Sequence, residues 1–98
     1  MLARKSNHAA AQHFLGLLLH QGGRSAEGLP LIEQSVRLLP NNPDFHNNLG
    51  TVLRDLGQVQ AAVDRFRKAV SLRPDQLAAR DNLGSSLKQL GQFEGAED

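Results

Sequence analysis

Apolar residues recur along this chain at helical spacing, in segments separated by short polar turns. Between residues 44 and 56 the apolar positions fall at i, i+4, i+7, i+8 and i+11, the pattern of an amphipathic helix. The segment 59–72 repeats this arrangement with a second set of small and apolar residues. The same pattern predicts an all-α chain of five helices and a short last segment: 9–21, 26–38, 43–56, 59–72, 76–90 and 93–98.

The dipeptide Leu-Gly recurs with a period of 34 residues, at 15–16, 49–50 and 83–84. Glycines at 23, 57 and 91 follow each pair at the same distance. A fixed period of this length predicts an α-α superhelix, a solenoid in which each unit stacks on its neighbours. We therefore expect a single domain over 1–98, with units 9–42, 43–76 and a truncated 77–98. Residues 1–8 are interpreted as the tail of a preceding unit or an N-terminal extension.

Local signals place the turns and one irregular helix. Asn42 is expected to cap a helix that begins at Pro43, and Ser25 to cap the second helix. Gly57 is expected to end a helix in the left-handed conformation. Gly28 and Pro30 lie in the first turns of the second helix, so this helix should begin late or bend near Pro30.

The second unit resembles the tetratricopeptide repeat (TPR), a helix-turn-helix unit of 34 residues. The residues that carry the resemblance are Leu49, Gly50, Ala62, Phe66, Ala69 and Pro74. Glycine inside a helix costs about 1 kcal/mol relative to alanine. A glycine repeated there suggests a close helix contact, which we expect between Gly50 and Ala62. The large aromatic residue usual early in the first helix of a TPR is missing.

The resemblance implies that the first helix of each unit lines a concave groove that binds a peptide or a helix. Nine residues are expected to line it: His13, Asn47, Asn48, Thr51, Asp55, Asp81, Asn82, Ser85 and Gln89. Asn48 and Asn82 occupy equivalent places, similar to the asparagine ladder of O-linked N-acetylglucosamine transferase arrays, which clamps a peptide backbone. Phe14 interrupts such a ladder in the first unit. The alternative is that these asparagines serve capping or helix packing.

Composition excludes several other functions. The formal net charge is +1 with acidic and basic residues mixed along the chain, so neither nucleic acid nor a membrane surface is an expected partner. The sequence has no cysteine, and no signal peptide is recognised, which fits a cytoplasmic protein. His13 and His20 would lie about 10.5 Å apart on one helix, too far to share a metal ion. We expect no metal, no cofactor and no enzymatic activity.

The leading prediction is a module for protein–protein interaction, with a protein or peptide as its partner. One alternative is an array that presents substrates to a larger enzyme such as a glycosyltransferase. Another is self-assembly, because the first and last helices should leave apolar faces open at both ends. We expect a homo-oligomer, with a symmetric dimer through the C-terminal ends as the favoured form.

Overall fold

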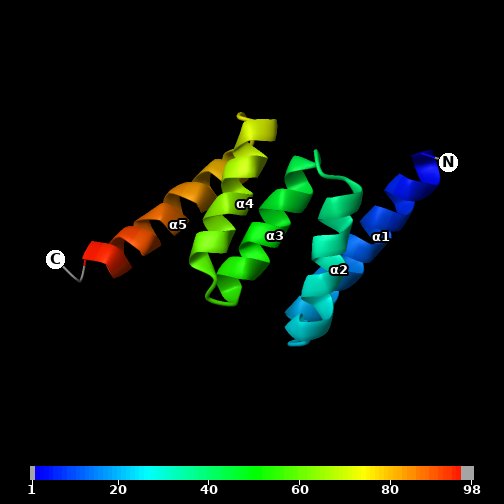
Figure 1. Cartoon of the computed structure of the whole chain (residues 1–98), viewed down its shortest axis with the longest axis horizontal. Helices are drawn as coiled ribbons and strands as arrows, with labels where there is room; N and C mark the ends of the chain where they lie inside the picture. The colour runs from blue at the N-terminus through cyan, green and yellow to red at the C-terminus, as the bar shows by residue number, and fades with distance from the viewer. Residues whose placement is uncertain (1, 96–98) are drawn as a thin grey trace.

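The computed structural model describes residues 2–95 of the chain, with the side chains of residues 8–91. Five α-helices follow one another, and the described residues contain no strand (Figure 1). Their bounds are α1 Leu2–Gln21, α2 Ser25–Leu38, α3 Pro43–Asp55, α4 Val59–Leu72 and α5 Leu77–Gly95. The all-α prediction is confirmed.

The helices form an elongated array with extents of 53 × 31 × 17 Å. Each helix packs on its neighbour in the chain, α1 on α2, α3 on α4 and α4 on α5, while α3 also contacts α1 and α5 (Figure 1). The first helices of successive repeats, α1, α3 and α5, therefore meet one after another. This is the arrangement that the 34-residue period predicts for a superhelix.

The turns within the first two repeats match the local signals. Gly23 and Gly57 both have φ near +83°, a left-handed conformation that glycine adopts without steric strain. Asn42 caps α3, since its side-chain oxygen accepts a hydrogen bond of 3.1 Å from the backbone N–H of Phe45, and Pro43 begins the helix. The caps predicted at Asn42 and Gly57 are confirmed.

The predicted outer boundaries of α1 and α5 were wrong. α1 begins at Leu2 instead of residue 9, and α5 continues to Gly95 instead of ending at residue 90. Gly91 lacks the positive φ of Gly23 and Gly57, so no turn separates a segment at 93–98. The left-handed turn accompanies a second helix that packs back on the first, and such a helix is absent from the described residues after Gly91. Residues 96–98 of the predicted segment lie outside the described residues.

The second helix also differs from its prediction. α2 begins at Ser25, so the expected late start was wrong. Arg24 occupies the N-cap position without a side-chain cap, so Ser25 is not the cap. Pro30 is exposed on an otherwise continuous helix, where its missing N–H removes only one intrahelical hydrogen bond.

Glycines in the first helices allow close contact with the second helices. A Cβ on Gly50 would lie 2.6 Å from the ring of Phe66, so the nearest neighbour is this ring rather than the expected Ala62. In the first repeat, a Cβ on Gly16 would lie 2.6 Å from Ile32 and 2.8 Å from the carbonyl oxygen of Gly28. Phe66 and Ile32 are fully buried in the core shared by the first two repeats.

Candidate functional site

Three side-chain contacts join the first helices of successive repeats with the same offset. His13 lies 3.0 Å from Asn48, His20 lies 2.9 Å from Asp55, and Asn47 lies 3.0 Å from Asn82. Each pair is separated by 35 residues, one more than the repeat period. A residue on one first helix therefore meets the next position of the following repeat. We call the α1–α3 contact the first junction and the α3–α5 contact the second junction.

His13 is the centre of the first junction. It is fully buried, and its ring stacks on Phe45 with a centroid distance of 3.9 Å and an interplanar angle of 9°. Burial lowers its pKa from 6.5 to about 4, against a smaller opposing effect of the Asp44 carboxylate, so the ring is neutral at neutral pH. A buried side chain cannot line an open groove, and the expectation that His13 does so is corrected.

The hydrogen bonds around His13 fix its tautomer. The Ser35 hydroxyl donates to the Ile32 carbonyl oxygen at 2.6 Å, so it must accept from Nδ1 of His13 at 2.8 Å. Nε2 then carries no proton and accepts from the Asn48 amide nitrogen at 3.0 Å. The Asn48 amide is thereby oriented, with its nitrogen toward His13 and its carbonyl oxygen left for other partners.

The second junction has different chemistry at the same positions. Asn82 donates its amide N–H to the side-chain oxygen of Asn47 at 3.0 Å. Its carbonyl oxygen accepts from the Arg54 guanidinium at 3.4 Å. The same guanidinium lies 5.5 Å from the centroid of the Phe66 ring, within cation–π range. Both ends of the Asn82 amide are thus in use within the chain.

A depression of about 200 Å³ lies between α1 and α3 beside the first junction. Seven residues from both helices line it: Leu17, His20, Gln21, Asn48, Thr51, Val52 and Asp55. Three of these, Asn48, Thr51 and Asp55, are among the expected groove residues. His20 bridges three helices there, because its Nδ1 lies 2.7 Å from the Ser25 hydroxyl and its Nε2 lies 2.9 Å from Asp55. We call this depression the α1–α3 cavity.

The expected groove residues do not share a single environment. Thr51 donates its hydroxyl to the Asn47 backbone carbonyl at 3.1 Å. Asp81 and Ser85 are exposed on α5, and Gln89 is half-buried there. The structure brings Asn48, Thr51 and Asp55 together in the α1–α3 cavity, and it joins Asn47 to Asn82 at the second junction.

Sequence reasoning missed the two serines that hold the histidines. Ser35 is fully buried, at the place where the second repeat has Ala69. A polar residue at an otherwise small apolar position was the available signal, since a buried hydroxyl needs a partner. Ser25 offered no comparable signal, because the N-cap interpretation already accounted for it.

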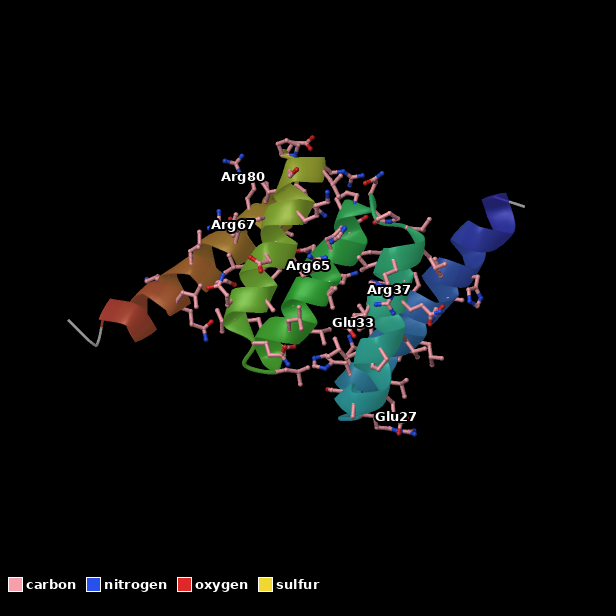
Figure 2. All side chains as sticks on the ribbon, viewed as in Figure 1. Glu27, Glu33, Arg37, Arg65, Arg67 and Arg80 are labelled. Atoms are coloured by element: carbon pink, nitrogen blue, oxygen red, sulfur yellow. The ribbon has the colours of Figure 1, made fainter. Side chains whose placement is uncertain are left out.

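The second helices carry charges of both signs away from this cavity. Figure 2 labels Glu27, Glu33 and Arg37 on α2 and Arg65 and Arg67 on α4. Among the described residues, no group of three or more His, Cys, Asp or Glu side chains could hold a metal ion. In the same part of the chain, none of the helices is long and apolar enough to cross a membrane.

Comparison with known families identifies the repeat. Two family profiles described as tetratricopeptide repeat match residues 31–64 and 9–34. No curated protein matches the sequence.

Solved structures of MamA are similar to this fold. MamA from Desulfovibrio magneticus RS-1 matches with a TM-score of 0.78 and 27% identity, over 91% of this chain and 50% of that chain. MamA AMB-1 matches with a TM-score of 0.76 and 28% identity, over 97% of this chain and 52% of that chain. The chain thus spans about half the length of these structures. The comparisons do not show a particular similarity to glycosyltransferase arrays.

Proposed function

Because the chain carries tetratricopeptide repeats, a class of protein–protein interaction module, we propose that it binds a segment of a partner protein along the surface formed by α1, α3 and α5. The segment is an extended peptide or a helix, and the role is non-catalytic. The observation that carries this proposal is the α1–α3 cavity. It joins an apolar floor, made by Leu17 and the buried Val52, to a polar rim that includes Gln21 and Asp55.

Asn48 and Asn82 support this function less directly than a continuous row of asparagines with free amides would. Asn82 uses both ends of its amide within the chain, and Asn48 uses its nitrogen on His13. Their hydrogen bonds favour the packing alternative for Asn82. Asn48 still offers its carbonyl oxygen to a ligand in the cavity. A proposal of peptide binding therefore rests on the cavity and on Asn48, rather than on a continuous clamp.

A peptide library displayed on phage and selected against the immobilised chain tests the proposal. Gln21→Arg places a long charged side chain at the rim of the cavity, and Ser71→Arg adds the same charge at an exposed position of α4. Selected peptides should bind the wild type and Ser71→Arg alike, and should bind Gln21→Arg several times more weakly. Peptides that bind all three proteins equally, or no selection above background, would refute binding in the cavity.

Presentation of substrates to a larger enzyme such as a glycosyltransferase is the weaker alternative. It rests on the resemblance of the Asn48 and Asn82 positions alone. Detection of transferase activity in the protein that contains these repeats, with loss of activity toward selected substrates in Gln21→Arg, would favour it.

A second proposed property is self-association through α5. Leu77 is 70% exposed and Leu87 is 39% exposed on this helix, and a Cβ on Gly84 would meet no atom within 4 Å apart from the adjoining backbone of its own helix. In a head-to-tail dimer, α1 of one copy would pack on α5 of the other. Phe14 would then occupy the position from which Asn48 and Asn82 donate hydrogen bonds in the other repeats, and a phenyl ring has no such donor. A symmetric dimer through α5 avoids this mismatch.

Sedimentation across a concentration series tests the dimer. The mass should rise from 10.7 kDa toward twice this value in the wild type and stay at the monomer value in Leu87→Glu. A wild-type mass that remains at 10.7 kDa at every concentration would exclude self-association.

A further inference from the structure

We propose that the α1–α3 cavity takes a cationic side chain, lysine or arginine, from the bound segment. The aliphatic stem would lie on Leu17 and Val52, and the charged group would meet Asp55 and the carbonyl oxygen of Asn48. This inference deepens the peptide-binding function proposed above and rests on it.

Three polar side chains of the cavity, Thr51, Asn48 and His20, already use a donor within the chain. The Thr51 hydroxyl donates to the Asn47 carbonyl, and the Asn48 amide donates to His13. His20 lies within hydrogen-bond distance of Ser25 through Nδ1 and of Asp55 through Nε2. Asp55 can only accept, so Nε2 of His20 donates to the carboxylate.

The remaining groups are mainly acceptors. Asp55 keeps one carboxylate oxygen beyond the bond to His20, and its side chain is 52% exposed. Asn48 keeps its carbonyl oxygen, whose position follows from the fixed tautomer of His13. Gln21 and the second amide hydrogen of Asn48 are neutral donors, whereas Asp55 carries a full charge. A ligand that supplies donors and positive charge therefore fits best, and lysine and arginine supply donors alone.

The apolar residues of the cavity suit the methylene groups of a lysine or arginine side chain. Leu17 is half-buried and lines the cavity together with the buried Val52, so apolar side chains lie beside the acceptors. Lysine and arginine place their methylene groups along apolar surface while the charged head stays in contact with polar groups or water. The cavity volume of about 200 Å³ admits a single side chain rather than a whole peptide turn.

The second junction contains an internal example of this contact. There the Arg54 guanidinium donates to the carbonyl oxygen of Asn82, the residue equivalent to Asn48. The first junction has His20 at the place of Arg54, and His20 bonds to Asp55 instead. Within the described residues, no side chain donates to the carbonyl oxygen of Asn48. A partner's arginine or lysine would supply the cation that the chain itself supplies at the second junction.

NMR titration of the ¹⁵N-labelled chain with small probes tests this inference. The probes are N-acetyl-lysine methylamide, N-acetyl-arginine methylamide and the uncharged N-acetyl-norleucine methylamide. The two cations should shift the amide signals of residues 17–21 and 48–55, and norleucine should bind more weakly. Asp55→Asn should weaken cation binding by about threefold to fivefold, the size expected for one ion pair near the surface.

Asp64→Asn is the matched control, because it removes the same charge from an exposed site on α4, outside both the cavity and the surface formed by α1, α3 and α5. It should leave cation binding within the error of the measurement. Equal weakening by both variants would show general electrostatic attraction and overturn the proposal, as would norleucine binding as tightly as lysine, or no shift with either cation.

A second variant guards against a change in folding of Asp55→Asn. Gln21→Lys leaves the bond between His20 and Asp55 intact and places a competing cation at the rim, so it should also weaken both cationic probes. Normal cation binding by this variant would contradict the proposal. If library peptides bind the groove but show no enrichment of lysine or arginine, this inference fails while the proposed peptide binding stands.

Discussion

The first and second junctions use the same two positions of the repeat but join the helices differently. At the first junction a buried imidazole stacks on Phe45 and links Asn48 to Ser35 across three helices. At the second, two partly exposed amides meet directly, and Arg54 completes the contact. The register is the same in both, because it follows from the 34-residue period and the packing of the first helices.

The difference separates two roles of one repeat position. The 34-residue period decides which residues meet at a junction. The residue type decides whether the contact is buried, whether it contains a titratable group, and which polar atoms remain for a ligand. His13 fills the first junction with a buried ring that binds only the amide nitrogen of Asn48, so the carbonyl oxygen of Asn48 remains available. Asparagine at position 47 accepts from the Asn82 amide, and the carbonyl oxygen of Asn82 accepts from Arg54 and is not left for a ligand.

Removal of the two central side chains should have unequal effects. His13→Ala leaves a cavity and unpaired groups on Asn48 and Ser35, and should lower the free energy of unfolding by about 2–4 kcal/mol. Asn47→Ala removes one neutral hydrogen bond, partly exposed, and should lower it by about 0.5–1.5 kcal/mol. Urea unfolding followed by circular dichroism measures both. Equal losses would mean that the histidine contributes no more than the amide.

Acid should weaken the first junction selectively. In the fold, burial lowers the pKa of His13 from 6.5 to about 4. Between these values the unfolded chain binds a proton that the folded chain does not, so the free energy of unfolding falls as the pH is lowered through this window. The loss from His13 should reach about 3 kcal/mol near pH 4 and approach its full value, slightly larger, about one pH unit lower.

His46 contributes in the same direction, because burial also lowers its pKa, with the Pro40 carbonyl opposing and Arg65 and Lys68 assisting. The experiment therefore compares the wild type with His13→Asn, which copies the second junction and keeps His46. Urea midpoints at pH 7 and pH 4.5 should move less in the variant. An identical shift in both proteins would remove His13 as the source of the acid sensitivity.

Two glycines extend the comparison to the second helices. Gly50→Ala should destabilise the fold by about 1–3 kcal/mol, because its Cβ would meet the Phe66 ring at 2.6 Å. Gly84→Ala should stabilise it by up to about 1 kcal/mol, since nothing apart from the adjoining backbone of its own helix lies within 4 Å and alanine favours the helix. Melting temperatures in opposite directions are expected. A loss of stability in Gly84→Ala would show that something covers α5 in solution, as in the proposed dimer.

Much of the fold followed from the sequence, because the period, the caps and the turn glycines act locally. The bounds of α4 and the left-handed Gly57 are confirmed in the structure. The limits of α1 and α5 did not follow, since a helix ends where its packing partners require it. The burial of His13 also escaped prediction, because helical spacing places a residue on a face but does not say which neighbour covers that face.

The candidate site was predictable in part for the same reason. Asn48, Thr51 and Asp55 share one helical face, and the structure places them in the lining of one cavity. Which ends of the asparagine amides stay free depends on His13, Ser35 and Arg54, which are distant in sequence. Hydrogen-bond direction across three helices is a property of the packed structure and has no local signal.

The smallest effect should come from the outer contact of the first junction. Asp55→Asn replaces the charged acceptor of the hydrogen bond from His20 with a neutral one. The Asp55 side chain is 52% exposed. Water and salt screen such a pair, so the free energy of unfolding should change by about 0.5 kcal/mol or less, and the change should shrink further in 0.5 M NaCl, where the Debye length is only about 4 Å. Ser71→Arg, an exposed charge change on α4, gives the size of a nonspecific effect. A loss as large as that of His13→Ala would mean that the rim, rather than the buried imidazole, holds α1 against α3. It would also mean that Asp55 is committed to the fold and unavailable to the cation proposed for the cavity.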